Sequence, residues 1–214
     1  MKTKTFQILI AALALAVFQP SLRADDGMLT AQERAKAIKL LKDSEARTID
    51  VVSKLNEEQL NFKPAPDKWS VLEVAEHIML SESRIFGAVQ KATESGPNPD
   101  WAAKTKGKTE FLQKAMLDRS HKAQAPEMLV PTGKLSRQEV LAKFKEARAK
   151  TLKFAEETQL PLKTYTMDHP VPVIGTLNGY QWLLMVPLHN MRHNEQIDEV
   201  MANPNFPKNK ERND

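Results

Sequence analysis

A chain of 214 residues with 41% hydrophobic content can bury one sizeable core, which favours a single domain. Its net charge of +4 includes three basic residues in an N-terminal leader; without them, 28 basic residues face 27 acidic ones, which excludes the basic surface that nucleic-acid binding requires. The absence of cysteine excludes disulfides, thiolate metal ligands, a cysteine nucleophile and a lipoprotein anchor.

Residues 1–24 have the pattern of a secretory signal peptide. Two lysines precede an apolar run from Ile8 to Phe18, and Ala24 stands at a suitable cleavage point. The run is shorter than the roughly 20 residues that a membrane-spanning helix needs, so an uncleaved anchor is the weaker alternative. We expect export to the periplasm or the medium, with residues 25–214 as the mature domain and no stable membrane insertion after cleavage.

Three helix starts are predicted by a Ser or Thr that precedes a Glu by three residues, because the two side chains can bond each other's backbone amides. These pairs are Thr30 with Glu33, Ser70 with Glu73, and Ser136 with Glu139. Apolar residues at helical spacing then predict helices over 31–60, 71–93, 137–158 and 177–201.

Two connections between these helices are long. Residues 95–135 form a Lys-rich insertion between the second and third helices, in which 110–120 has the pattern of a short extra helix. The stretch DHPVPVIGTLNG before the fourth helix predicts a loop, and strands have little support anywhere. The predicted fold is all-α: an antiparallel four-helix bundle with a long insertion between helices two and three.

The fourth helix carries PLHNMRHNEQI, in which His189 and His193 lie four residues apart and therefore on one face. Such a pair alone is more often two solvent-facing or hydrogen-bonded core residues than a metal site. His77 adds weight to the metal interpretation, because it lies on the core side of the second helix, between Val74 and Ile78. Bundles build metal sites from facing helices, so we expect these three imidazoles to hold one divalent ion.

Three imidazoles leave further coordination positions open, as in catalytic rather than structural zinc sites. An ion held in this way can lower the pKa of a bound water toward ~7. Zinc and nickel are the preferred candidates, although ferrous iron also accepts imidazole.

Two residues are candidates to orient these imidazoles through their second ring nitrogen. Glu73 lies four residues before His77, and Gln196 lies three after His193. Each also has an ordinary alternative, since Glu73 belongs to a capping pair and Gln196 could be solvated. No general base stands out, and Glu73, Glu76 or a carboxylate of the insertion remain open choices.

Three other polar residues lie near these motifs. Arg192 points to another face of the helix, so we expect a structural role or an anion contact at the rim of the site. His121 in the insertion and His169 in the Pro-rich loop are expected to be exposed, with a place at the mouth of the site as the alternative for His169. Pro187 removes one helical hydrogen bond just before His189 and tends to kink the helix.

Three segments in this order resemble the DinB-like family, also called the YfiT-like superfamily. They are EEQLNFKPAPDKWSVLEVAEHI, PTGKLSRQEVLAKFKEARAKTL and HPVPVIGTLNGYQWLLMVPLHNMRHNEQIDEV, within residues 30–202. The resemblance implies an up-down-down-up four-helix bundle with a divalent metal on three histidines, here His77, His189 and His193. The family is similar in fold to bacterial thiol-dependent transferases and isomerases.

Export shifts the expected reaction away from thiol transfer, which depends on abundant small thiols in a reducing cytoplasm. We therefore expect an exported metal-dependent hydrolase acting on an unidentified small molecule, with a homodimer as one option for its assembly. A non-catalytic metal-binding or partner-binding bundle is the alternative, and a thiol-dependent transferase is a further one.

Overall fold

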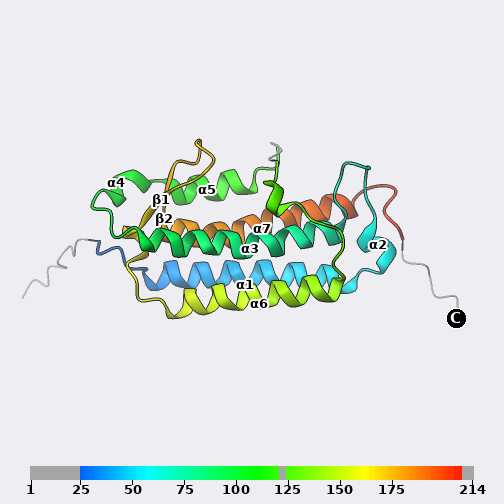
Figure 1. Cartoon of the computed structure of the whole chain (residues 1–214), viewed down its shortest axis with the longest axis horizontal. Helices are drawn as coiled ribbons and strands as arrows, with labels where there is room; N and C mark the ends of the chain where they lie inside the picture. Colours follow the sequence, from blue (N-terminus) through cyan, green and yellow to red (C-terminus); the bar gives the residue numbers. More distant parts are fainter. Residues whose placement is uncertain (1–24, 121–123, 209–214) are drawn as a thin grey trace, which may run out of the picture.

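The computed structural model describes residues 25–120 and 124–208; the predicted signal peptide and His121 lie outside them. Four long helices form a bundle (Figure 1): α1 (Ala31–Lys54), α3 (Val71–Glu94), α6 (Arg137–Glu157) and α7 (Gly179–Met201). α1 and α7 run in one direction and α3 and α6 in the other, so the topology is up-down-down-up. Each helix packs against one parallel and one antiparallel neighbour, α1 and α3 both contacting α6 and α7. The predicted fold class is confirmed.

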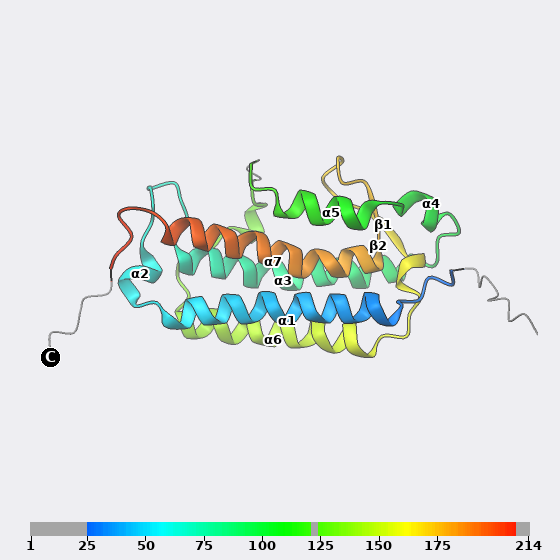
Figure 2. The same cartoon turned by 180° about the vertical axis from the view of Figure 1, so that it is seen from behind.

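Shorter elements lie in the connections between the four long helices (Figure 2). They are α2 (Glu57–Asn61), α4 (Trp101–Thr105), α5 (Lys108–Leu117), the 3₁₀ turns η1 (Glu127–Leu129) and η2 (Leu162–Thr164), and the strands β1 (Thr166–Asp168) and β2 (Thr176–Asn178). α5 is the short helix expected within the insertion, and it packs along α7.

The strands correct an expectation, because Thr166–Asp168 and Thr176–Asn178 pair as an antiparallel hairpin in a stretch predicted to have no strand. Two helix boundaries also differ. The first helix ends at Lys54, and a new short helix begins at Glu57; the fourth begins at Gly179, after β2.

All three predicted capping boxes form, with Thr30, Ser70 and Ser136 at the N-caps. Asn56 with Gln59 and Asn178 with Gln181 make two more of the same geometry. These two boxes begin α2 and α7 and thereby account for both boundary differences.

The bundle interior has two hydrophobic clusters. One surrounds Leu41, Val89 and Leu183, and the other surrounds Val52, Ile78 and Ile197. Along each of the four long helices, buried polar residues separate the residues of one cluster from those of the other. We call these polar residues the polar layer: Ser44, Thr48, Glu82, Arg148, Thr151, Asn190 and Asn194. Across residues 25–120 and 124–208, no helix combines the length and apolarity needed to cross a membrane.

Candidate metal centre

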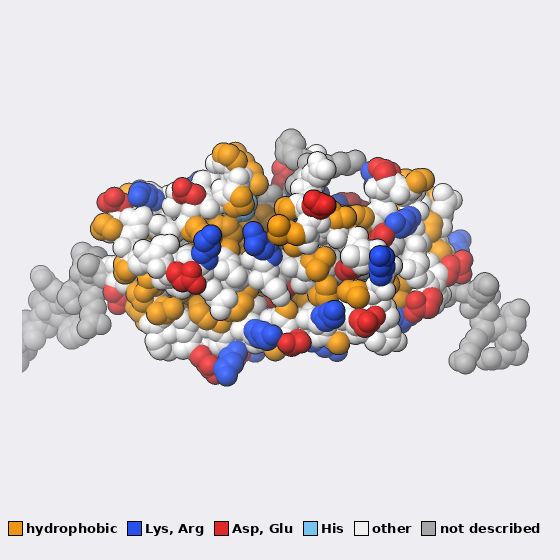
Figure 3. Space-filling model, in the orientation of Figure 1, with side chains coloured by type: hydrophobic (Ala, Val, Ile, Leu, Met, Phe, Trp, Pro, Cys, Tyr) orange, Lys and Arg blue, Asp and Glu red, His pale blue; other side chains and the backbone are white. Residues whose placement is uncertain are grey.

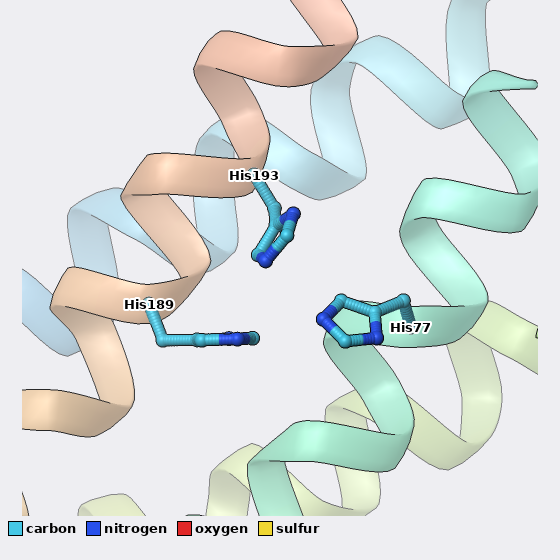
Figure 4. Close-up of side chains that lie close together, drawn as sticks. All are labelled: His77, His189 and His193. Carbon is cyan, nitrogen blue, oxygen red and sulfur yellow. The ribbon is translucent and has the colours of Figure 1, made fainter. Parts of the chain in front are cut away.

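The structure brings together the three histidines on which the sequence prediction rested. One ring nitrogen from each of His77, His189 and His193 lies within 4.8 Å of the others. The ring centroids are 4.4 Å apart for His77 and His193, 4.4 Å for His189 and His193, and 5.2 Å for His77 and His189. Figure 4 shows α3 and α7 presenting the rings toward a common point.

His77 is held by the backbone of η1. Its Nδ1 lies 2.7 Å from the carbonyl oxygen of Leu129, so Nδ1 carries the proton and donates it. Nε2 is then unprotonated and available as a ligand atom. The hydroxyl of Ser81, 3.4 Å away, makes only a long contact with Nε2.

His193 is held in the same way by a side chain. Its Nδ1 lies 2.8 Å from Oε1 of Gln196, which makes Nδ1 the donor and leaves Nε2 with a free lone pair. Gln196 thus occupies the orienting position that its spacing suggested. Leu129 had no such signal, because a backbone carbonyl far along the chain leaves no trace in the sequence.

Of the two possibilities for Glu73, the contact with His77 is not made. One oxygen of Glu73 accepts from the backbone amide of Ser70 at 2.8 Å, and the other accepts from Nζ of Lys63 at 2.7 Å. The capping alternative therefore describes Glu73.

Glu76 is also engaged away from the imidazoles. Its carboxylate accepts from the amide and the hydroxyl of Thr132, at 2.9 and 2.8 Å, and from the amide of Gly133 at 3.0 Å. Glu76 therefore anchors the segment that follows η1. Neither Glu73 nor Glu76 is placed as a general base.

Burial lowers the pKa of all three imidazoles. For His189, the other two rings and Arg192 lower the pKa further. The pKa of His193 falls to about 3, chiefly through burial and then through His77. The three rings are therefore neutral at pH 7, which is the form that binds metal.

Arg192 has the structural role that was one of its predicted options. Its guanidinium donates to the backbone oxygens of Met116, at 3.2 Å, and Asp118, and so ties α7 to the end of α5. Arg119 donates both to the carbonyl of Arg192 and to the carboxylate of Glu199. These contacts fix the insertion next to His193.

His169 lies apart from the three-histidine cluster, and the expectation that it is exposed is wrong. It is half-buried, and its ring stacks on Trp182 with a centroid separation of 5.1 Å. Its Nδ1 accepts from the backbone amide of Val171 at 3.0 Å. Trp182 precedes His189 by two turns of α7, so His169 covers the bundle about 10 Å from the cluster along the helix.

The residues present suit a divalent metal. Three neutral imidazole nitrogens converge, and two of the rings are fixed by a partner on the opposite nitrogen. This nitrogen donor set fits zinc or nickel.

Comparison with known proteins agrees with this arrangement. The family model of the DinB superfamily matches residues 40–197, which include all three histidines of the cluster. The chain belongs to the DinB superfamily.

Two proteins of Bacillus subtilis are similar to this DinB-superfamily protein, one in sequence and one in fold. The uncharacterized protein YuaE (strain 168) is 24% identical over 166 residues, which cover 75% of this chain and 94% of YuaE. The solved structure of YfiT, described as a probable metal-dependent hydrolase with an unusual four-helix bundle topology, superposes with a TM-score of 0.51. That match covers 86% of this chain and 91% of YfiT at 14% identity, so it shows a shared fold.

Proposed function

We propose that this DinB-superfamily protein is an exported hydrolase that uses one divalent ion, zinc or nickel, held by His77, His189 and His193. The observation that carries the proposal is the convergence of three neutral imidazole nitrogens from α3 and α7 within 4.8 Å. The description of YfiT as a probable metal-dependent hydrolase supports the reaction class. The signal-peptide pattern of residues 1–24 supports export.

The chain's own residues have distinct tasks in this proposal. The Nε2 atoms of His77 and His193 bind the ion, while the Leu129 carbonyl and Gln196 keep the proton on the opposite nitrogens. A divalent ion in an open three-histidine site supplies a water whose pKa is lowered toward ~7 and polarises the bond to be cleaved.

A non-catalytic metal-binding bundle is the second candidate, favoured by one observation. The carboxylates of Glu73 and Glu76 are both bonded to other groups, so neither serves as a base. In that case the ion would serve only to hold α3 against α7.

Metal analysis and a substrate panel test the proposal together. The purified chain is expected to contain one ion per molecule, whereas His189→Gln contains none. His169→Gln is the matched control and is expected to keep the ion, since His169 stacks on Trp182 outside the cluster. Ester, amide and phosphoester hydrolysis are then measured before and after chelation.

A chelator-sensitive hydrolysis that returns with added zinc or nickel supports the enzyme. A chain that holds one ion, hydrolyses none of these classes and loses much of its thermal stability on chelation is instead a structural metal protein.

A further inference from the structure

Exposed large hydrophobic side chains are concentrated on two segments of the described chain. They are Phe111 (37% exposed), Met128 (65%), Val130 (44%), Leu160 (38%), Val171 (48%) and Val173 (75%). All except Leu160 lie on the insertion or on the hairpin loop, residues 169–175. Single exposed apolar residues are ordinary, but a concentration beside one site indicates a binding surface.

One part of the insertion, residues 127–133, which we call the strap, borders the three-histidine cluster directly. Its Leu129 carbonyl accepts the hydrogen bond from His77 at 2.7 Å, and Met128 and Val130 flank that residue. Glu76 fixes the far end of the strap through Thr132 and Gly133. Met128 and Val130 are therefore exposed on an anchored segment.

The hairpin loop is anchored by contacts with α7 and α5. His169 stacks on Trp182 of α7, and the indole nitrogen of Trp182 lies 3.3 Å from the carbonyl oxygen of Met167. Lys108 of α5 donates to the Ile174 carbonyl at 2.6 Å and also lies over the ring of Phe111. Figure 3 shows hydrophobic side chains gathered over both the hairpin loop and the strap, with a hollow between them.

The charges around the imidazoles complement an anionic or carbonyl group. The cations Arg119 and Arg192 lower the pKa of His193, and Arg192 lowers that of His189; Arg119 is itself paired with Glu199 at 2.5 Å, and Arg192 donates to the backbone oxygens of Met116 and Asp118. Three neutral imidazoles also leave the charge of a divalent ion uncompensated. An oxygen with negative or partly negative charge therefore suits the three-histidine cluster, while the exposed apolar side chains of the strap and the hairpin loop suit hydrocarbon.

We infer, on the basis of the proposed function, that the substrate is an ester or amide of an apolar straight-chain carboxylic acid. Its carbonyl end reaches the three-histidine centre, and its hydrocarbon chain lies between the strap and the hairpin loop. Water adds to the carbonyl carbon, and the bond from that carbon to oxygen or nitrogen breaks. The displaced alcohol or amine takes one proton of the water, the second proton passes to the solvent from the ester reaction or to the amine from the amide reaction, and the other product is the carboxylate of the chain.

Straight-chain carboxylates from acetate to octanoate, which are product analogues, provide the probe. Their dissociation constants for the zinc-loaded chain are measured by calorimetry. Affinity is expected to rise about twofold to fourfold per added methylene, since a fully buried methylene gives about fourfold.

Three variants test whether the rise in affinity with chain length depends on the strap and the hairpin loop. Met128→Ser and Val173→Ser are expected to reduce the gain per methylene, because each removes an exposed apolar side chain from the rim. Leu160→Ser is the matched control, since Leu160 is exposed but lies outside the strap and the hairpin loop, and it is expected to keep the full gain. Melting temperatures check that all three variants fold.

The outcomes separate this inference from the proposed function. If zinc and acetate bind but affinity does not change with chain length, the acyl substrate is wrong and the metal site stands. If Met128→Ser and Val173→Ser show the same gain in affinity per methylene as the unmodified chain, the acyl-substrate inference is also wrong. If the chain binds no divalent ion, both proposals fail.

Discussion

Two of the three histidines of the cluster donate a hydrogen bond from Nδ1, and their acceptors are of different kinds. Leu129 offers a backbone carbonyl to His77, whereas Gln196 offers a side-chain amide oxygen to His193. Because the carbonyl belongs to the backbone, side-chain substitution cannot remove it. Gln196 is therefore the residue at which orientation of a ligand can be tested alone.

Gln196→Ala is expected to weaken zinc or nickel binding by about 10- to 100-fold, because His193 loses the acceptor that fixes its tautomer and ring orientation. Competition titration with a chromogenic chelator measures the change. Gln90→Ala, at an exposed glutamine of α3, is the control and should bind as the unmodified chain does. An unchanged affinity in Gln196→Ala would show that the hydrogen bond is incidental.

The metal-free chain is expected to lose stability as the pH falls below about 6.5. Burial lowers the folded-state pKa of His77, His189 and His193, so protons bind to the unfolded chain first. The contribution of these histidines to the free energy of unfolding is therefore fully present above their pKa in the unfolded chain. It is lost as the pH falls toward their pKa in the folded chain, by about 1 kcal/mol per histidine per pH unit.

Urea unfolding at several pH values, in the presence of chelator, tests this dependence. His193→Gln is expected to show a shallower decline, since one titrating group is gone. Equal slopes for the two proteins would mean that His193 is protonated equally in the folded and unfolded states.

The three clustered histidines were accessible to sequence reasoning because each has a positional signal. His189 and His193 share a helix face, and His77 interrupts an apolar stripe. Glu73 had an equally good spacing, but the free amide of Ser70 and the ammonium of Lys63 occupy its carboxylate. Spacing along a helix cannot decide between two competing partners of one side chain.

At the scale of the helices, the polar layer joins all four members of the bundle. Arg148 of α6 is fully buried and donates two hydrogen bonds of 2.8 Å to Glu82 of α3. It also donates to the Leu41 carbonyl of α1 and, at 3.0 Å, to Asn190 of α7. Asn190 is adjacent to His189, so the layer holds the ligand-bearing helix in register with α3.

Arg148→Met is expected to lower the free energy of unfolding by about 3–5 kcal/mol, because it leaves the carboxylate of Glu82 buried without its partner. The double variant Glu82→Leu/Arg148→Met removes both charges and should recover most of this loss. Lys150→Met is the control: its pair with Glu146 is exposed, and the change should stay below about 1 kcal/mol. Urea unfolding distinguishes these cases, and a double variant no more stable than Arg148→Met would refute the argument.

Helix boundaries were predictable where Ser or Thr made the cap and failed where Asn did. Asn56 with Gln59 and Asn178 with Gln181 form the same reciprocal bonds as Ser with Glu. The pattern of Ser or Thr followed by Glu does not detect these caps, so it predicts a first helix that continues past Lys54 and a fourth helix that begins before Gly179. The hairpin was missed because three-residue strands are too short for a period-2 pattern to appear.

At the scale of the whole molecule, the metal is expected to stabilise a chain that is already folded. Two hydrophobic clusters and the polar layer join the four helices without any ion. Zinc at about 100 times its dissociation constant adds about 2.7 kcal/mol, or roughly 5–10 °C in melting temperature. Scanning calorimetry with and without chelator measures this shift, which His77→Gln should abolish; an unfolded metal-free chain would contradict the expectation.

Because α1 and α7 run parallel, the start of α1 and the end of α7 lie at opposite ends of the bundle. α1 begins at one end, and α7, 23 residues long, finishes at the other, roughly 35 Å away (Figures 1 and 2). Most domains have neighbouring termini and tolerate circular permutation through a short linker. Here a permutant needs a linker of at least about 11 residues laid along the outside of the bundle. Two fusion partners attached directly before α1 and directly after α7 would accordingly be kept apart by the full length of the bundle.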